Sequence, residues 1–140
     1  MIDEDITEKI IGAAYKVANT LGAGFLEKVY ENALAIELKK SGLSVKQQYS
    51  LPVYYEDQLV GNYFADLLVE DSVIVELKAV TSLVKAHKAQ VLNYLKAGKM
   101  ELGLLVNFGG NSLKWERITR FQDKAVIQND ETNNTSWDDF

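Results

Sequence analysis

The stretch that most constrains the fold runs from Ala65 to Ala79, where two apolar segments flank the polar residues 70–72. Three charged residues, Asp66, Glu76 and Lys78, are set within these apolar segments. An ionised group in apolar surroundings is costly unless it is paired with an opposite charge or bound to a metal. The stretch therefore predicts a β-hairpin that carries either a divalent-metal site or a structural cluster of ion pairs.

The register of this hairpin decides whether the charges meet. If residues 70–72 form the loop, Asp66 lies directly opposite Glu76, with the two Cβ atoms roughly 4.5–5.5 Å apart. Glu76 and Lys78 share that face because side chains alternate along a strand. A shift of one residue would instead place Asp66 opposite Val75 or Leu77 and separate the two carboxylates onto opposite faces.

The rest of the chain predicts a mixed sheet between helices. Helices are expected where apolar residues recur every three or four positions, over residues 6–21, 26–40 and 83–98, and strands over residues 45–55, 59–69, 73–80, 101–108 and 113–120. Pro52 indicates an edge position or a bulge in the first strand. The apolar segment 101–108 is typical of a strand buried on both faces.

The order of these elements predicts the topology. The first three strands should form an antiparallel meander, whereas the strand–helix–strand unit over residues 73–108 should place two parallel strands around a right-handed crossover. The fold class is α/β (α+β), with helices on both faces of the sheet. We expect one domain over residues 1–125 and a flexible tail over residues 126–140, which has no periodicity.

Composition limits the chemistry of the protein and the compartment in which it is expected. The 140 residues include no cysteine, so disulfides and thiolate metal sites are excluded. The sequence has no apolar run of 18 residues and opens with acidic residues, which predicts a cytoplasmic protein with no membrane segment. No G-x-S-x-G or H-E-x-x-H motif points to another hydrolase chemistry.

Charge is unevenly distributed along the chain. The formal net charge is −5, yet residues 76–120 carry 8 Lys and Arg against 3 Asp and Glu. Such a local excess matters more for binding a phosphate backbone than the total charge does. The alternative is that these lysines are scattered over the surface and serve only solubility.

Several motifs together resemble a known nuclease superfamily. Asp66, nine intervening residues and then Glu76-Leu77-Lys78, on the second and third strands, are similar to the PD-(D/E)XK motif, with Ala65 in place of the usual proline. This resemblance implies a restriction-endonuclease-like core with the order αβββαβ.

Two further motifs lie on the flanking helices. Gly24, Glu27 and Tyr30 spell G-x-x-E-x-x-Y, which resembles the motif of the GxxExxY family, a branch of that superfamily. Gln90 and Tyr94 have the Q-x-x-x-Y spacing of RecB-like nucleases. The resemblance covers roughly residues 6–120.

The resemblance implies roles for the charged residues. Asp66, Glu76 and the backbone carbonyl of Leu77 would bind Mg²⁺ or Mn²⁺, which prefer oxygen ligands. Glu27 would complete this acidic cluster, directly or through a water molecule. Lys78 would orient the attacking water and offset charge on the phosphate. The structural alternative is that Lys78 is only a counter-ion for the two acids.

The helical residues also have structural alternatives. Glu27 would be favourable in the first turn of any helix because of the helix dipole. Gln90 and Tyr94 are four residues apart and so side by side, where they could orient the acids, contact the nucleic acid or form a polar seam between helix and sheet. His87 shares a face with Gln90, as a candidate metal ligand or proton shuttle, or as a solvated surface histidine.

Two functions from different classes follow. The first is a magnesium-dependent nuclease that hydrolyses phosphodiester bonds of DNA rather than RNA. The second is a catalytically inactive domain of the same fold that binds nucleic acid or another protein. Because one chain offers one active site, cleavage of both strands of a duplex would require a homodimer.

Overall fold

Three helices and five strands make up residues 3–120, the part of the chain that the computed structural model describes. In chain order they are α1 (Asp3–Leu21), α2 (Glu27–Lys40), β1 (Val45–Tyr55), β2 (Gln58–Val69), β3 (Val73–Lys78), α3 (Lys85–Gly98), β4 (Leu102–Asn107) and β5 (Lys114–Thr119). The expected order of elements is confirmed. The predicted tail over residues 126–140 lies outside the described residues.

The strands form one mixed sheet in the order β1-β2-β3-β4-β5. The first three are antiparallel, β3 and β4 are parallel, and β5 is antiparallel to β4. The meander and the parallel crossover predicted from the sequence are therefore confirmed. Every residue of β4 is buried, and Pro52 lies in the edge strand β1, close to a register shift between Val53 and Tyr54.

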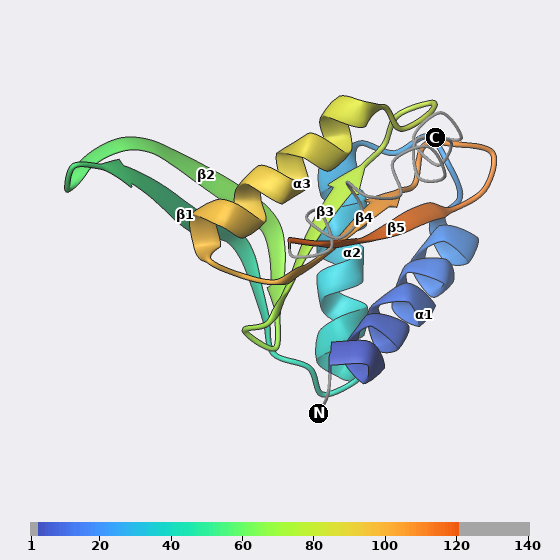
Figure 1. Ribbon diagram of the computed structural model, residues 1–140. Coiled ribbons are helices and arrows are strands. Elements are labelled where there is room, and N and C mark those ends of the chain that lie inside the picture. The colour runs from blue at the N-terminus through green and yellow to red at the C-terminus, as the bar shows by residue number, and fades with distance from the viewer. Residues whose placement is uncertain (1–2, 121–140) are drawn as a thin grey trace.

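Helices cover both faces of the sheet (Figure 1). Helices α1 and α2 bury Ile10 and Leu34 against one face, where Val75 of β3 joins the same cluster. Helix α3 buries Val91 against the other face, together with Ile74 of β3. Since side chains alternate along β3, this strand contributes to both cores.

Strand β3 ends earlier than predicted. The strand was expected to reach Val80 but stops at Lys78, because the side chain of Asn107 takes the hydrogen bonds of the next peptide groups. The Asn107 carboxamide accepts from the Val80 N–H at 3.0 Å and donates to the Val80 carbonyl at 2.9 Å. Helix α3 likewise begins at Lys85 rather than residue 83, because the Val84 N–H is bound by the side chain of His87.

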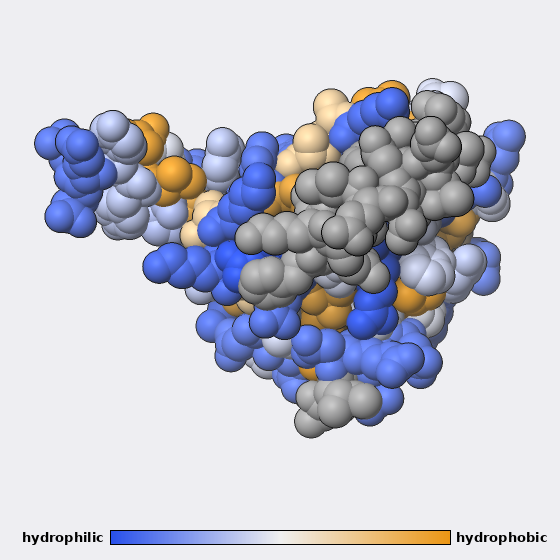
Figure 2. Space-filling view, in the orientation of Figure 1, coloured by the Kyte–Doolittle hydropathy of each residue, from blue (hydrophilic) through white to orange (hydrophobic). Residues whose placement is uncertain are grey.

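The β1–β2 hairpin extends away from the rest of the sheet as a projecting arm, which we define as residues 49–65 (Figure 1). Only the base of the arm packs against the domain, where Leu51 and Ala65 are buried in the core beneath α3. Its turn consists of Glu56 and Asp57, both with positive φ, as in the two-residue turns that match strand twist. At the base of the arm, the Tyr63 ring lies 5.3 Å from the Tyr94 ring of α3. Figure 2 shows apolar surface on the arm, which carries the exposed side chains of Tyr54, Tyr55, Leu59, Val60, Tyr63 and Phe64.

None of the helices within residues 3–120 is both long and apolar enough to cross a membrane.

Candidate metal and nuclease site

The hairpin between β2 and β3 has the register that brings the carboxylates together. Leu67 pairs with Val75 and Val69 pairs with Val73, so residues 70–72 form the loop, as predicted. Counted away from the loop, the last residues paired by backbone hydrogen bonds are Leu67 and Val75, so Asp66 and Glu76 lie just beyond the ladder. From this point β2 leaves β3 and continues into the arm.

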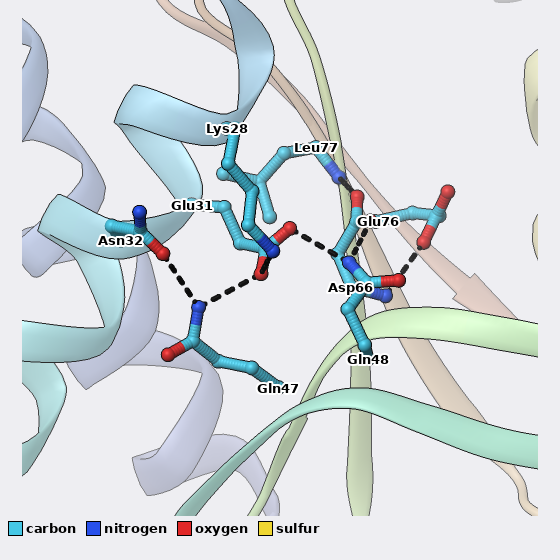
Figure 3. Close-up of polar contacts among 8 residues, drawn as sticks. All are labelled: Lys28, Glu31, Asn32, Gln47, Gln48, Asp66, Glu76 and Leu77. Carbon is cyan, nitrogen blue, oxygen red and sulfur yellow. Dashed lines mark hydrogen bonds and ion pairs between the residues drawn. The ribbon is translucent and has the colours of Figure 1, made fainter.

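Beyond the end of the ladder, the side chains of Asp66 and Glu76 connect the two strands in place of backbone hydrogen bonds. The N–H of Asp66 donates to Glu76 Oε1 at 3.0 Å, and the N–H of Leu77 donates to Asp66 Oδ2 at 2.8 Å (Figure 3). Both carboxylates are buried, with residue exposures of 8% for Asp66 and 3% for Glu76. Lys78 Nζ lies 3.8 Å from Glu76 Oε2. The three charges expected to converge therefore do so, at the fork between two strands.

Glu27 approaches this fork from helix α2. It is the first residue of α2. Partial burial raises the pKa of Glu27, and the negative charge of Asp66 raises it further, whereas Lys78 lowers it. The Glu27 carboxylate is thus close enough to interact with the charges on both β2 and β3.

The G-x-x-E-x-x-Y pattern has a clear structural basis. The Tyr30 hydroxyl donates to the Gly22 carbonyl at 2.6 Å and accepts from the Phe25 N–H at 3.2 Å. Its ring stacks on Phe108, with centroids 4.6 Å apart. Gly24 lies between these contacts with a φ of 107°. Tyr30 therefore fixes the loop that precedes α2, and so fixes where the helix presents its first carboxylate.

Two polar residues of the site were not identified from the sequence. Glu31 is 3% exposed, and its carboxylate accepts hydrogen bonds from Lys28, Gln47 and Gln48, each at 2.8–2.9 Å. Gln48 Nε2 also donates to Asp66 Oδ1 at 3.2 Å (Figure 3). Gln48 thereby connects the acid of α2 with the acid of β2.

The sequence does contain a signal for Glu31. It precedes Leu34, Ala35 and Leu38 by three, four and seven residues, so it lies on the buried face of α2, where an unpaired carboxylate is not expected. Gln48 has no comparable signal. Its φ of 49° is unusual for a residue with a side chain, and such strain often occurs at functional sites.

Helix α3 contributes a tyrosine from the opposite face. Gln90 Nε2 donates to the Tyr94 hydroxyl at 2.9 Å, so the two residues lie side by side as expected. Burial raises the pKa of Tyr94 to about 12, with further contributions from the charges of Glu76 and Asp66. Tyr94 therefore stays protonated near the acid cluster and can donate a hydrogen bond there.

His87 has a structural contact at the start of α3. Its Nδ1 accepts a hydrogen bond from the Val84 N–H at 2.9 Å, and this contact caps the helix. Burial lowers the pKa of His87, and the positive charge of Lys78 lowers it further, so the imidazole is neutral. Only Nε2 is left for the metal or proton role expected of this residue.

Ionisation of the acid cluster is disfavoured, mainly because the carboxyl groups are buried. Burial raises the pKa of Glu76 to about 8, and the charge of Asp66 adds to the effect. Burial also raises the pKa of Asp66, partly opposed by the Leu77 N–H. Closely spaced carboxylates that resist ionisation are stabilised by a bound cation, and a set of oxygen donors suits Mg²⁺ or Mn²⁺.

The carboxylates are not arranged around a common point in this structure. Within residues 3–120, no three His, Cys, Asp or Glu side chains are placed so that they could hold one ion. The reason is visible at the fork, where Asp66 and Glu76 each turn to a backbone N–H. The donor chemistry of the site fits a divalent metal, and binding would require these side chains to rotate.

Comparisons with known proteins agree with this architecture. A family model described as the PD-(D/E)XK nuclease superfamily matches residues 4–120. No curated protein matches the chain. A solved structure described as "Crystal structure of SSO0001" is 18% identical, with a TM-score of 0.54 over 84% of this chain, which spans 59% of that protein. At this identity the likeness shows the fold alone, and the mixed sheet between helices is the expected restriction-endonuclease-like fold.

Proposed function

Because the chain belongs to the PD-(D/E)XK nuclease superfamily, we propose that it is a magnesium- or manganese-dependent nuclease that hydrolyses phosphodiester bonds of DNA. The observation that carries this proposal is the convergence of Asp66, Glu76 and Lys78 at the buried fork between β2 and β3. A site built only for stability would gain little from two neighbouring buried carboxylates whose pKa values are raised.

The metal-binding residues of this proposal are Asp66, Glu76, the carbonyl of Leu77 and Glu27. When bound, a divalent ion would supply a Lewis acid and make an attacking water more acidic. The Lys78 ammonium, close to Glu76, would orient that water and offset negative charge on the phosphate. This role would account for a cation beside the acids, at a distance of 3.8 Å from Glu76.

Two pairs of side chains would hold the reacting groups in place. Gln48 donates to both Asp66 and Glu31, so the position of the Asp66 carboxylate depends on α2 as well as on its own strand. On the α3 side, Gln90 fixes Tyr94, whose protonated hydroxyl can donate to an oxygen of the substrate or of the acid cluster. These are positioning roles, and their loss would slow the reaction without removing the charged core.

Nucleic acid as the substrate is supported by charge. Residues 85–99 contain four lysines and no acidic residue, and this segment includes α3, which carries Tyr94 to the site. A polyanion that follows such a surface would release counterions, so binding should weaken steeply with salt. Membership of the GxxExxY branch is part of this proposal, supported by the contacts that Tyr30 makes around Gly24.

Substitutions at the core test the activity. Asp66→Asn, Glu76→Gln and Lys78→Met should each abolish cleavage of plasmid, linear and single-stranded DNA with Mg²⁺ or Mn²⁺, while Lys39→Gln, an exposed change on α2, should leave the rate unchanged. RNA of the same sequence is the comparison substrate. Full activity in the Glu76→Gln and Lys78→Met variants would end the nuclease proposal.

The projecting arm favours a second candidate, an inactive domain that binds a protein. The arm exposes aromatic and aliphatic side chains and carries no Lys or Arg between residues 49 and 65, which suits a protein surface better than a phosphate backbone. Titration with Mg²⁺ and Mn²⁺ by calorimetry separates the two candidates, since the inactive domain should not bind the ion.

A homodimer, needed to cut both strands of a duplex, would appear in sedimentation at micromolar concentration.

A further inference from the structure

A polar pocket lies at the carboxyl ends of the two parallel strands. Its volume is about 310 Å³, and its walls are residues 81–83, which follow β3, and residues between Asn107 and Lys114, which end β4 and lead into β5. In open α/β sheets, ligands bind at the carboxyl ends of the parallel strands, and β3 and β4 are the parallel pair of this mixed sheet. The proposed nuclease site does not use this pocket.

One lining residue of the pocket, Asn107, lies on the same face of the sheet as Glu76 and Lys78. Lys78 pairs with Asn107, and Glu76 pairs with Leu105, whose side chain belongs to the core beneath α3. Asn107, two residues after Leu105, therefore shares the α3 face with Lys78. Since neighbouring strands are about 4.8 Å apart, Asn107 in the lining of the pocket is next to Lys78.

The two loops that form the pocket are fixed before any ligand arrives. Asn107 Oδ1 accepts from the N–H groups of Val80 and Gly109, each at 3.0 Å, and Phe108 donates its N–H to the Lys78 carbonyl at 2.8 Å. Gly109 permits this contact, because a Cβ there would lie 2.4 Å from the Val80 nitrogen. The pocket is thus preorganised, and little ordering is required for binding.

The lining is rich in hydrogen-bond donors. It includes the hydroxyls of Thr81, Ser82 and Ser112, the carboxamide of Asn111 and the ammonium of Lys114, and no acidic side chain among residues 3–120 lines it. Hydroxyls and an ammonium suit phosphate oxygens and sugar hydroxyls. The hydroxyl, amide and ammonium groups that residues 81–114 contribute suit a phosphate better than a metal ion, which prefers carboxylate oxygens.

We propose that this pocket binds the phosphate and sugar of the nucleotide adjacent to the scissile bond. The position next to a scissile bond rests on the proposed function, whereas binding of a nucleotide in the pocket does not depend on catalysis. Its volume is at the small end of ligand pockets, of the order expected for a single nucleotide. The pocket would then position the backbone of the substrate relative to Lys78.

The test uses the full chain, labelled with ¹⁵N, and thymidine monophosphate as the ligand. The expected result is a set of amide shifts confined to residues 81–83 and 109–112, weaker shifts of the same amides with inorganic phosphate, and none with thymidine. Lys114→Gln should weaken binding of the monophosphate about tenfold, the factor for one charge-assisted hydrogen bond, while Lys39→Gln should not change it. Ser112→Phe should fill the pocket and remove binding.

The outcomes separate this inference from the nuclease proposal. Unmoved pocket amides, or equal affinities of the Lys114→Gln and Lys39→Gln variants, would overturn the pocket even if wild-type protein cleaves DNA. Conversely, binding at the pocket by a protein that cleaves nothing would support the nucleotide site and refute only the nuclease. Glu76→Gln should retain pocket binding in either case, because Glu76 does not line the pocket. The amide spectrum itself shows whether each variant is folded.

Discussion

Replacing Glu76 by glutamine should make the metal-free protein more stable while destroying its activity. Burial raises the pKa of Glu76 from 4.5 to about 8, so the folded protein binds a proton that the unfolded chain releases across this pH range. Stability must therefore fall as pH rises from about 4.5 to about 8, since the native state holds more protons than the unfolded state. Glutamine has no ionised form and retains an oxygen for the Asp66 N–H.

The size of the effect follows from the shift. One pKa unit corresponds to about 1.36 kcal/mol, so the full shift of Glu76 would cost the wild type about 5 kcal/mol above pH 8. Because the charge of Asp66 contributes to the raised pKa of Glu76, we expect a gain of about 3–5 kcal/mol for Glu76→Gln at about pH 9 and almost none at about pH 4.5.

Urea unfolding in EDTA, followed by circular dichroism at several pH values, measures this difference. Glu8→Gln, an exposed change on α1, is the matched control and should leave the wild-type pH dependence in place. Mg²⁺ at 100 times its dissociation constant should restore about 2.7 kcal/mol to the wild type but nothing to Glu76→Gln. A variant that is less stable than wild type at every pH would refute this reasoning.

Three further changes test individual contacts. Tyr30→Phe removes hydrogen bonds to Gly22 and Phe25 and should cost about 1–2 kcal/mol of unfolding free energy in a denaturant titration, with a lower cleavage rate because α2 loses its fixed start. Gln48→Gly should be about 1 kcal/mol more stable than Gln48→Ala by thermal melting, because both lose the side-chain contacts but only glycine adopts a φ of 49° without strain; equal melting temperatures would contradict this. Gly109→Ala should cost about 3 kcal/mol or more, since the added Cβ meets backbone atoms that cannot move aside, and a wild-type melting temperature would show that the loop gives way.

The fold and the hairpin register could be predicted because their causes are local. The polar residues 70–72 lie between two apolar segments, so only one loop leaves both segments intact. Asp66 and Glu76 then follow directly after the last pair, Leu67 and Val75, and lie next to each other. The parallel arrangement of β3 and β4 follows from the helix between them. Patterns of this kind depend on residues that are near in sequence.

The features that were missed depend on distant residues. Strand β3 ends at Lys78 because of a carboxamide on Asn107, which is 27 positions beyond Val80. Gln48 became part of the site only because α2 packs beside β1 and β2, where one side chain reaches both Glu31 and Asp66. Glu31 is the exception, because its place among Leu34 and Leu38 on the helix could have marked it.

The projecting arm is joined to the domain at the residues that hold the acid cluster. Gln48 and Asp66 occupy the two strands where the arm begins, and the ladder to β3 has already ended there. Asp66 belongs to β2, the strand that continues into the arm, whereas Glu76 belongs to β3, which does not. A molecule that bends the hairpin at its aromatic end would therefore displace the Asp66 carboxylate relative to Glu76. Binding to the arm would then change the geometry of the acid cluster, although the bound molecule is far from the fork.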